Sequence, residues 1–215
     1  AIAQKITVCT RCPLCHGRTK AVPGVGVLNP AVVVVGEGPG HDEDVQGEPF
    51  VGPAGKLLDK MLSAVSLSRR TNCFIANIVK CRPPNNRVPT PDEAAACESF
   101  LQAQLFALKP KLILCAGSTA AKNLLKTANG VTKLRGRFYD WNGIPVAVTY
   151  HPSALLRDAS LKRPAWEDLK LMRARLSELM PDYAAPFEAE AALSTAAQAA
   201  SAATSAPPAP QYGSR

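Results

Sequence analysis

The sequence lacks the long apolar segments that would carry a chain into or across a membrane. No apolar run in the chain approaches the roughly 20 residues that a membrane-spanning helix needs. The opening residues, AIAQKITV, also lack the basic head and the long apolar stretch of a secretory signal. We therefore expect a soluble, cytoplasmic protein. An initiator Met is absent as well, so we expect that the natural N-terminus is not included.

Two other familiar patterns are missing. The seven cysteines are odd in number and no export signal accompanies them, which argues against a disulfide scaffold. The stretch Glu37-Gly38-Pro39-Gly40 is not a dinucleotide fingerprint, because Pro39 intervenes and the third glycine is misplaced. No Gly-Lys-Ser/Thr phosphate loop is present either. Gly38 and Gly40 would instead let the backbone approach a planar ligand closely, although a plain tight turn explains this loop when it is taken alone.

The charge balance of the chain is strongly basic. The net charge is +8, and the residues from Tyr183 onward contribute −1, so the remainder carries +9. A basic body suits a polyanionic partner such as nucleic acid. Charge alone leaves a generic basic surface equally open.

Short apolar runs rich in β-branched residues alternate with amphipathic segments along most of the chain. The runs predict buried strands at 31–38, 73–80 and 111–117, and residues 137–150 predict two strands joined by a turn. Helices are predicted over 54–65, from Thr90 to about 108, after Ser118, and over about 164–178. This alternation predicts an α/β protein, a three-layer α/β/α sandwich around a mainly parallel sheet of about four strands.

The last part of the chain has a different composition. Residues 1–180 carry the alternating pattern and form the predicted domain, whereas residues 184–215 consist largely of Ala, Ser and Pro. Such a segment buries too little apolar surface to offset the cost of ordering it. We therefore expect a disordered tail whose Ala-rich part is transiently helical.

Unusual loops follow all of the predicted parallel strands. They are the stretches 36–55, 77–87, 117–118 and 150–157. The carboxyl ends of parallel strands meet at one edge of a sheet, and ligands of open α/β sheets bind there. One Gly-Pro loop has a simple structural explanation, but four such loops on one rim favour a functional site.

Several side chains on this rim have both a structural and a functional interpretation. Phe50 either anchors its loop or offers a stacking platform for a base. Asn77 either makes a turn bond or reads the edge of a pyrimidine through its amide donor and acceptor. His151 is one of three histidines, and a lone His is more often structural than catalytic. Leu155 and Arg157 could wedge into a base stack and hold phosphate, or could belong to an ordinary helix face.

Five of the cysteines lie outside apolar runs and are candidates for a metal site: Cys9, Cys12, Cys15, Cys81 and Cys97. A zinc ribbon normally has two Cys-x-x-Cys knuckles, whereas this chain has one tight group and two single partners 16 residues apart. Thiolates around an iron–sulfur cluster need only converge on it, so the spacing favours iron–sulfur modestly and leaves zinc open. The other two cysteines, Cys73 and Cys115, lie in apolar runs and are predicted to be small core residues.

Three motifs together, GEGPGHDEDVQGEPFVGPAG, NIVKCRPPNNRVP and YHPSALLR, resemble the family 4 uracil-DNA glycosylases, the iron–sulfur type. The resemblance covers roughly residues 6 to 178. It implies a monomeric α/β/α enzyme of bacterial or archaeal type that removes uracil from single- or double-stranded DNA and leaves an abasic site for base excision repair. It also implies a 4Fe–4S cluster, whose ligand pattern falls on Cys9, Cys12, Cys81 and Cys97. Cys15 has no matching role.

The resemblance also implies roles for the residues on the rim. Phe50 stacks on the uracil, Asn77 bonds its edge, and His151 bonds the O2 atom that gains charge as the glycosidic bond breaks. Leu155 fills the gap left by the flipped base, and Arg157 holds the DNA backbone.

The loop after the first strand departs from the best-known uracil glycosylases. Their water-orienting Asp is matched here by Gly38, and the tyrosine that excludes the thymine methyl is matched by Gly40. Glu43 is then the best candidate to shape the pocket against thymine. Glu37 is a candidate loop organiser that contacts base or water, and the group that activates water stays open.

Three rival functions are each disfavoured by a feature of the sequence. A relative that traps uracil-DNA covalently carries a basic, His-containing insertion, which NIVKCRPPNNRVP lacks. A non-catalytic iron–sulfur DNA-binding module would explain the charge and the cysteines, but not the presence of Glu37, Asn77 and His151 on one rim. A phosphate-binding α/β enzyme is disfavoured by Pro39 and the missing phosphate-loop lysine.

Overall fold

A six-stranded sheet in the order β1-β3-β2-β4-β6-β5 forms the centre of the computed structural model, which describes residues 2–204. The strands are β1 (Val25–Gly26), β2 (Val32–Gly36), β3 (Cys73–Asn77), β4 (Leu112–Ala116), β5 (Phe138–Trp141) and β6 (Ile144–Thr149). Strands β3, β2, β4 and β6 are mutually parallel, and β1 and β5 pair antiparallel at the two edges. The predicted α/β class and the mainly parallel sheet are confirmed. The sheet has more than the predicted four or so strands: β5 is the first of the two strands predicted at 137–150, and the short strand β1 is additional.

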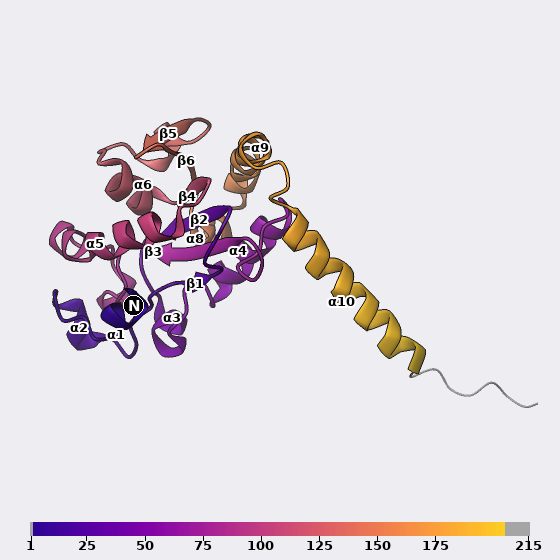
Figure 1. Ribbon diagram of the computed structural model, residues 1–215. Helices are drawn as coiled ribbons and strands as arrows, with labels where there is room; N and C mark the ends of the chain where they lie inside the picture. The colour runs from indigo at the N-terminus through magenta and orange to yellow at the C-terminus, as the bar shows by residue number, and fades with distance from the viewer. Residues whose placement is uncertain (1, 205–215) are drawn as a thin grey trace, which may run out of the picture.

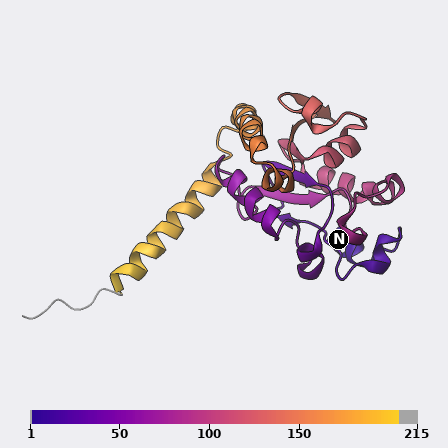
Figure 2. The ribbon, with the colours of Figure 1, turned by 180° about the vertical axis from the view of Figure 1, so that it is seen from behind.

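Helices cover both faces of the sheet (Figures 1 and 2). In chain order they are α1 (Ile2–Thr7), α2 (Leu14–Gly17), α3 (His41–Gln46), α4 (Pro53–Ser63), α5 (Pro91–Leu108), α6 (Ser118–Leu125), α7 (Val131–Leu134), α8 (Pro152–Arg157), α9 (Lys162–Leu179) and α10 (Ala185–Thr204), with 3-10 turns η1 (Pro84–Asn86) and η2 (Ala159–Leu161). Alternate side chains of β2 pack into the two hydrophobic cores, one on each face of the sheet. Val33 and Val35 pack with the α5–α6 side, and Val32 and Val34 pack with the α4–α9 side. This alternation produces the three-layer sandwich.

Helix α5 begins where the sequence predicts. The Thr90 hydroxyl accepts a hydrogen bond from the Glu93 backbone N–H at 3.3 Å, and the Glu93 carboxylate accepts one from the Thr90 N–H at 2.8 Å. Arg87 donates to both oxygens of Glu93, at 2.8 and 2.6 Å. The loop after β3 is therefore fastened to the first turn of α5. The Arg87 hydrogen bond lowers the pKa of Glu93 to about 2.

The C-terminal segment differs from the predicted tail over residues 185–204, which form helix α10. Alanine has the highest intrinsic helix propensity, so this composition supports a helix even where little packs against it. Figure 1 shows α10 extending away from the sheet, and Leu193 is 73% exposed. The buried part of the chain ends near Tyr183, whose hydroxyl donates to the Val65 carbonyl at 3.0 Å. Residues 205–215 of the predicted tail lie outside the described residues. Within residues 2–204, no helix is long and apolar enough to cross a membrane.

Candidate active site

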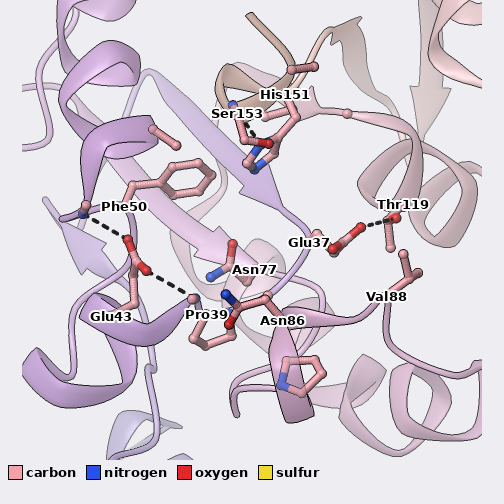
Figure 3. A pocket seen from close by; sticks show the side chains of 18 of the residues that line it. Glu37, Pro39, Glu43, Phe50, Asn77, Asn86, Val88, Thr119, His151 and Ser153 are labelled. Atoms are coloured by element: carbon pink, nitrogen blue, oxygen red, sulfur yellow. Dashed lines mark hydrogen bonds between the residues drawn. The ribbon is translucent and has the colours of Figure 1, made fainter. Parts of the chain in front are cut away.

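A cavity of about 690 Å³ opens at the carboxyl ends of the parallel strands (Figure 3). Its wall combines the segments that follow β2, β3, β4 and β6, so the structure brings the four predicted loops together at one rim. The predicted site residues that line it are Glu37, Gly38, Gly40, Glu43, Phe50, Asn77, His151 and Arg157.

Phe50 forms an aromatic wall of the cavity. Its side chain is 6% exposed, and its ring lies 5.4 Å from the His151 ring, centroid to centroid, at an interplanar angle of 32°. Its backbone adopts a left-handed φ of 54°, and Arg69 fixes this conformation by donating to the Phe50 carbonyl at 2.9 Å. A Cβ atom at Gly55 would lie 1.9 Å from the same carbonyl, so only glycine fits there. The loop therefore holds a flat apolar surface beside the histidine.

Asn77 is the last residue of β3 and is 2% exposed. Its Oδ1 atom is buried and has no hydrogen-bond partner among the described residues. A Cβ atom on Gly36, the residue paired with Asn77 on β2, would lie 2.4 Å from this oxygen, so the glycine leaves room for the amide. A buried acceptor without a donor costs free energy, and native structures rarely contain one unless a ligand or water completes it. Because the Asn77 side chain also lines the cavity, a donor from water or a ligand could complete this acceptor.

His151 caps the N-terminus of α8 with its side chain. The Nδ1 atom accepts a hydrogen bond from the Ser153 backbone N–H at 3.2 Å and lies 2.7 Å from the Ser153 hydroxyl. Burial, together with the weaker effect of the Arg157 charge, lowers the pKa of His151 to about 4, and Glu43 opposes this shift. The imidazole is therefore neutral near pH 7. Because Nδ1 accepts, the single proton is on Nε2, which makes that nitrogen a donor.

The depressed pKa of His151 predicts a pH-dependent contribution to stability. Between about 4 and the ordinary value of 6.5 the unfolded chain binds the proton more readily than the folded chain. The free energy of unfolding should therefore rise with pH through this window and lose this contribution as pH falls. Urea unfolding of the wild type and His151→Asn at about pH 4.5 and about pH 7 measures the effect. A wild-type-minus-variant difference that does not change with pH would contradict the neutral histidine.

Glu43 joins the two loops that form one side of the cavity. Its carboxylate accepts hydrogen bonds from the backbone N–H groups of Gly40 at 3.1 Å, Val51 at 2.9 Å and Gly52 at 3.1 Å. The α3 loop and the Phe50 loop therefore keep a fixed separation. These bonds hold the two loops on this side of the cavity together, and the role of Glu43 in shaping the pocket against thymine stays a prediction.

Glu37 lies directly after β2, and its Oε2 atom accepts a hydrogen bond from the Thr119 hydroxyl (Figure 3). Sequence reasoning missed Thr119, although it noted the two preceding residues at the end of the third buried strand. Tyr150, which the sequence analysis included in the fourth loop without a role of its own, lines the cavity beside His151. The bond from α6 fixes one carboxylate oxygen of Glu37 and leaves the other able to accept from water.

The predicted role of Leu155 is not supported by its position. Leu155 is 2% exposed and faces the protein interior, whereas the neighbouring Leu156 is 52% exposed. Helix α8 starts at Pro152, and that start sets which leucine faces inward. A base-stack wedge must be exposed, so Leu156 is the leucine on this helix that meets the requirement. Arg157 is exposed at the edge of the cavity, as its predicted contact with DNA backbone requires.

A second group of side chains surrounds a small space away from the cavity. Its cysteines are Cys9, Cys12, Cys15, Cys81 and Cys97, which we call the cysteine centre. Cys9 and Cys12 lie between α1 and α2, and Cys15 lies in α2. Cys81 is in the loop after β3, and Cys97 is in α5. Arg18 donates to the Cys81 Sγ atom at 3.1 Å and to the Cys9 carbonyl at 2.9 Å. An arginine bond of this kind stabilises thiolate sulfur.

The shared space makes the cysteine centre a candidate ligand set for an iron–sulfur cluster. No group of three potential ligands among the described residues is close enough to bind one metal ion. Ligands of a cluster stand farther apart, because each thiolate binds a different iron. The remaining thiols, Cys73 and Cys115, are 0% exposed in β3 and β4, and burial raises the pKa of Cys115 to about 12. They are core residues, as the sequence predicts.

Comparison with known proteins agrees with this geometry. The model of the uracil DNA glycosylase superfamily matches residues 23–170, which places the chain in that class. The type-4 uracil-DNA glycosylase of Thermotoga maritima is 46% identical over 173 residues, covering 79% of this chain and 90% of the relative. That of Archaeoglobus fulgidus is 41% identical over 177 residues, covering 79% of this chain and 88% of the relative. The chain belongs to the type-4 uracil-DNA glycosylase family, which confirms the family resemblance.

Proposed function

We propose that this protein removes uracil from DNA by hydrolysing the N-glycosidic bond, leaving an abasic site for base excision repair. One observation carries the proposal: the orphaned Oδ1 of Asn77 and the neutral His151 line one cavity with Phe50. Uracil presents an N3–H donor between two carbonyl acceptors. Asn77 Oδ1 can accept from N3–H while Nδ2 donates to O4, and Phe50 supplies the stacking surface.

A base in duplex DNA reaches this cavity only after it leaves the DNA double helix. An enzyme that acts on a base flips the nucleotide out of the stack and reads its edge in a pocket. Arg157 is placed to hold the backbone at the cavity edge, and the exposed Leu156 could occupy the space left by the base. All of these groups come from a single chain, so we propose that the monomer is active.

Bond cleavage places negative charge on uracil O2. The Nε2–H of a neutral His151 is a fixed donor for that charge, and its proton position is set before the substrate arrives. Gly38 carries no side chain, so Glu37 is the carboxylate placed to orient the attacking water through Oε1. Thr119 holds the other oxygen. Glu43 keeps the two loops at the separation that disfavours the thymine methyl.

We propose that Cys9, Cys12, Cys81 and Cys97 hold a 4Fe–4S cluster in a structural role. Such a cluster supplies cross-links among the segments that carry its thiolates. The N-terminal segment, the loop after β3 and α5 would then be fixed together, which orders the strand end that carries Asn77. The proposed domain covers residues 1–180, with residues 184–215 outside it.

Substitution of single cysteines should separate ligands from the spare thiol. We expect Cys12→Ser to lose the visible absorbance of the cluster and to lower the melting temperature, because a ligand and a cross-link are lost together. Cys15→Ser, which removes a thiol lining the same space, should keep both. Iron content, visible spectra and thermal unfolding of the two variants provide the comparison. Equal cluster content in Cys12→Ser and the wild type would refute the ligand assignment.

The function itself is tested with a labelled single-stranded oligonucleotide containing one uracil. After incubation with cluster-loaded protein, alkali should cleave the strand at the uracil position, because alkali breaks DNA at abasic sites. A matched thymine oligonucleotide should stay intact. The absence of strand breaks with uracil DNA would reject the enzyme and favour a non-catalytic DNA-binding module.

A further inference from the structure

Lys80 is an unusual buried lysine between the cavity and the cysteine centre. Its side chain is 1% exposed, and its Nζ atom donates to the Asn77 carbonyl at 2.8 Å and to the Gln104 side-chain oxygen at 2.7 Å. Buried lysines are normally paired with a carboxylate, because an isolated ammonium loses its hydration. Here its hydrogen-bond partners among the described residues are two neutral oxygens. Two hydrogen bonds to neutral oxygens offset only part of this cost.

The surroundings of Lys80 connect the two sites. On one side it lines the cysteine centre together with its chain neighbour Cys81 and with Cys97 of α5. On the other side its ammonium holds the backbone of Asn77, whose side chain faces the cavity. Gln104 extends the connection, since its amide nitrogen donates to the Pro23 carbonyl at 2.7 Å. Two segments that are distant in the sequence therefore converge on one ammonium group.

We propose that Lys80 is a positioning residue that fixes Asn77 against the cysteine centre and thereby sets the geometry with which the uracil edge is read. The inference rests on the proposed function and assigns Lys80 to the same site. Lys80 does not contact the base. It holds the end of β3, and a displacement of even about 1 Å in a residue that orients substrate can slow a reaction about 100-fold.

The cysteine centre has a physical reason to support this arrangement. Thiolates that ligate metal carry negative charge, and Cys97 and Cys81 lie beside the Lys80 ammonium in the same space. Their charge offsets part of the cost of burying the ammonium, while the two neutral oxygens direct its N–H bonds. An ordered cysteine centre therefore favours the lysine conformation that holds Asn77.

The test replaces Lys80 by Met, which keeps an unbranched side chain only one atom shorter and removes the ammonium donors. We expect single-turnover uracil release to slow about 10- to 100-fold, while the affinity for DNA without uracil and the visible absorbance of the cluster stay unchanged. Affinity for free uracil, measured by calorimetry, should fall as well. The matched control is Lys111→Met, which removes an exposed lysine outside both sites and should match the wild type.

A double-mutant cycle with Asn77→Ala separates positioning from general stability. If Lys80 acts through Asn77, Lys80→Met should slow the Asn77→Ala protein by no more than about twofold. If Lys80→Met slows uracil release by the same factor, about 10- to 100-fold, in both the wild type and the Asn77→Ala protein, the proposal is wrong. If Lys80→Met does not fold, Gln104→Met replaces it, because it removes one hydrogen-bond partner of the Lys80 ammonium. Gln104→Met should slow uracil release by a smaller factor, and this slowing should be absent in the Asn77→Ala protein. Failure of the wild type to release uracil would reject the proposed function, whereas normal release by both variants would reject only the role of Lys80.

Discussion

We expect His151→Ala to slow uracil release by about 100- to 1,000-fold under single-turnover conditions, because it removes the donor aimed at the charge that develops on O2. Nδ1 is held by the Ser153 backbone, so the donor is already oriented before the reaction. Such an interaction is stronger in the transition state than with the bound base, and the loss should appear in the rate rather than in DNA affinity. Rapid-quench measurement of base release and a separate binding titration provide the two quantities.

The control for this substitution is His16→Ala. His16 lies exposed in α2, outside the cavity, so its removal should leave the excision rate unchanged. Circular dichroism and cluster absorbance should show that both variants keep the fold and the cluster, since neither the sheet nor the cysteine centre includes His151. Wild-type release by His151→Ala would show that the histidine is not the group that stabilises the leaving base.

The second large effect concerns Asn77. Asn77→Ala removes both hydrogen bonds to the uracil edge, and we expect excision to slow about 100-fold or more, since each unmade bond to a buried partner costs about 1–3 kcal/mol. Asn77→Asp keeps the shape of the side chain but places an acceptor opposite the O4 acceptor of uracil. It should therefore be slowed at least as strongly, despite its normal volume.

Asn129→Ala provides the comparison, because Asn129 is exposed and outside the cavity. Rates are measured on the same uracil oligonucleotide at saturating protein for all three variants. If Asn77→Ala and Asn77→Asp both excise at the wild-type rate, the orphaned Oδ1 is not the uracil reader.

The positions of the site residues were predictable because they depend on strand ends. The apolar runs that end at Gly36, Asn77 and Thr149 form buried parallel strands, and the residues that follow parallel strands lie at one rim of the sheet. The convergence of distant segments on the cavity therefore follows from a pattern that is local in the sequence. The roles of these residues came from the family resemblance rather than from the pattern.

Details that depend on helix phase or on side-chain contacts were not predictable in the same way. Leu155 and Leu156 are equivalent in sequence, and only the start of α8 at Pro152 decides which one is buried. Thr119 and Lys80 act through hydrogen bonds to groups that are fixed by tertiary packing, and no local spacing marks them. Edge strand β1 is two residues long, too short to produce a periodic signal.

The most direct test of the account measures free uracil and DNA-bound protein in one reaction with excess uracil-containing oligonucleotide. Chromatography quantifies the released base, and a denaturing gel detects any protein fixed to DNA. We predict that uracil accumulates well beyond the amount of protein, that abasic DNA forms in equal amount, and that no protein–DNA band persists. Release that stops at one uracil per protein with a persistent band would indicate covalent trapping, and uracil that stays in the DNA would contradict the assignment of the cavity as a glycosylase site.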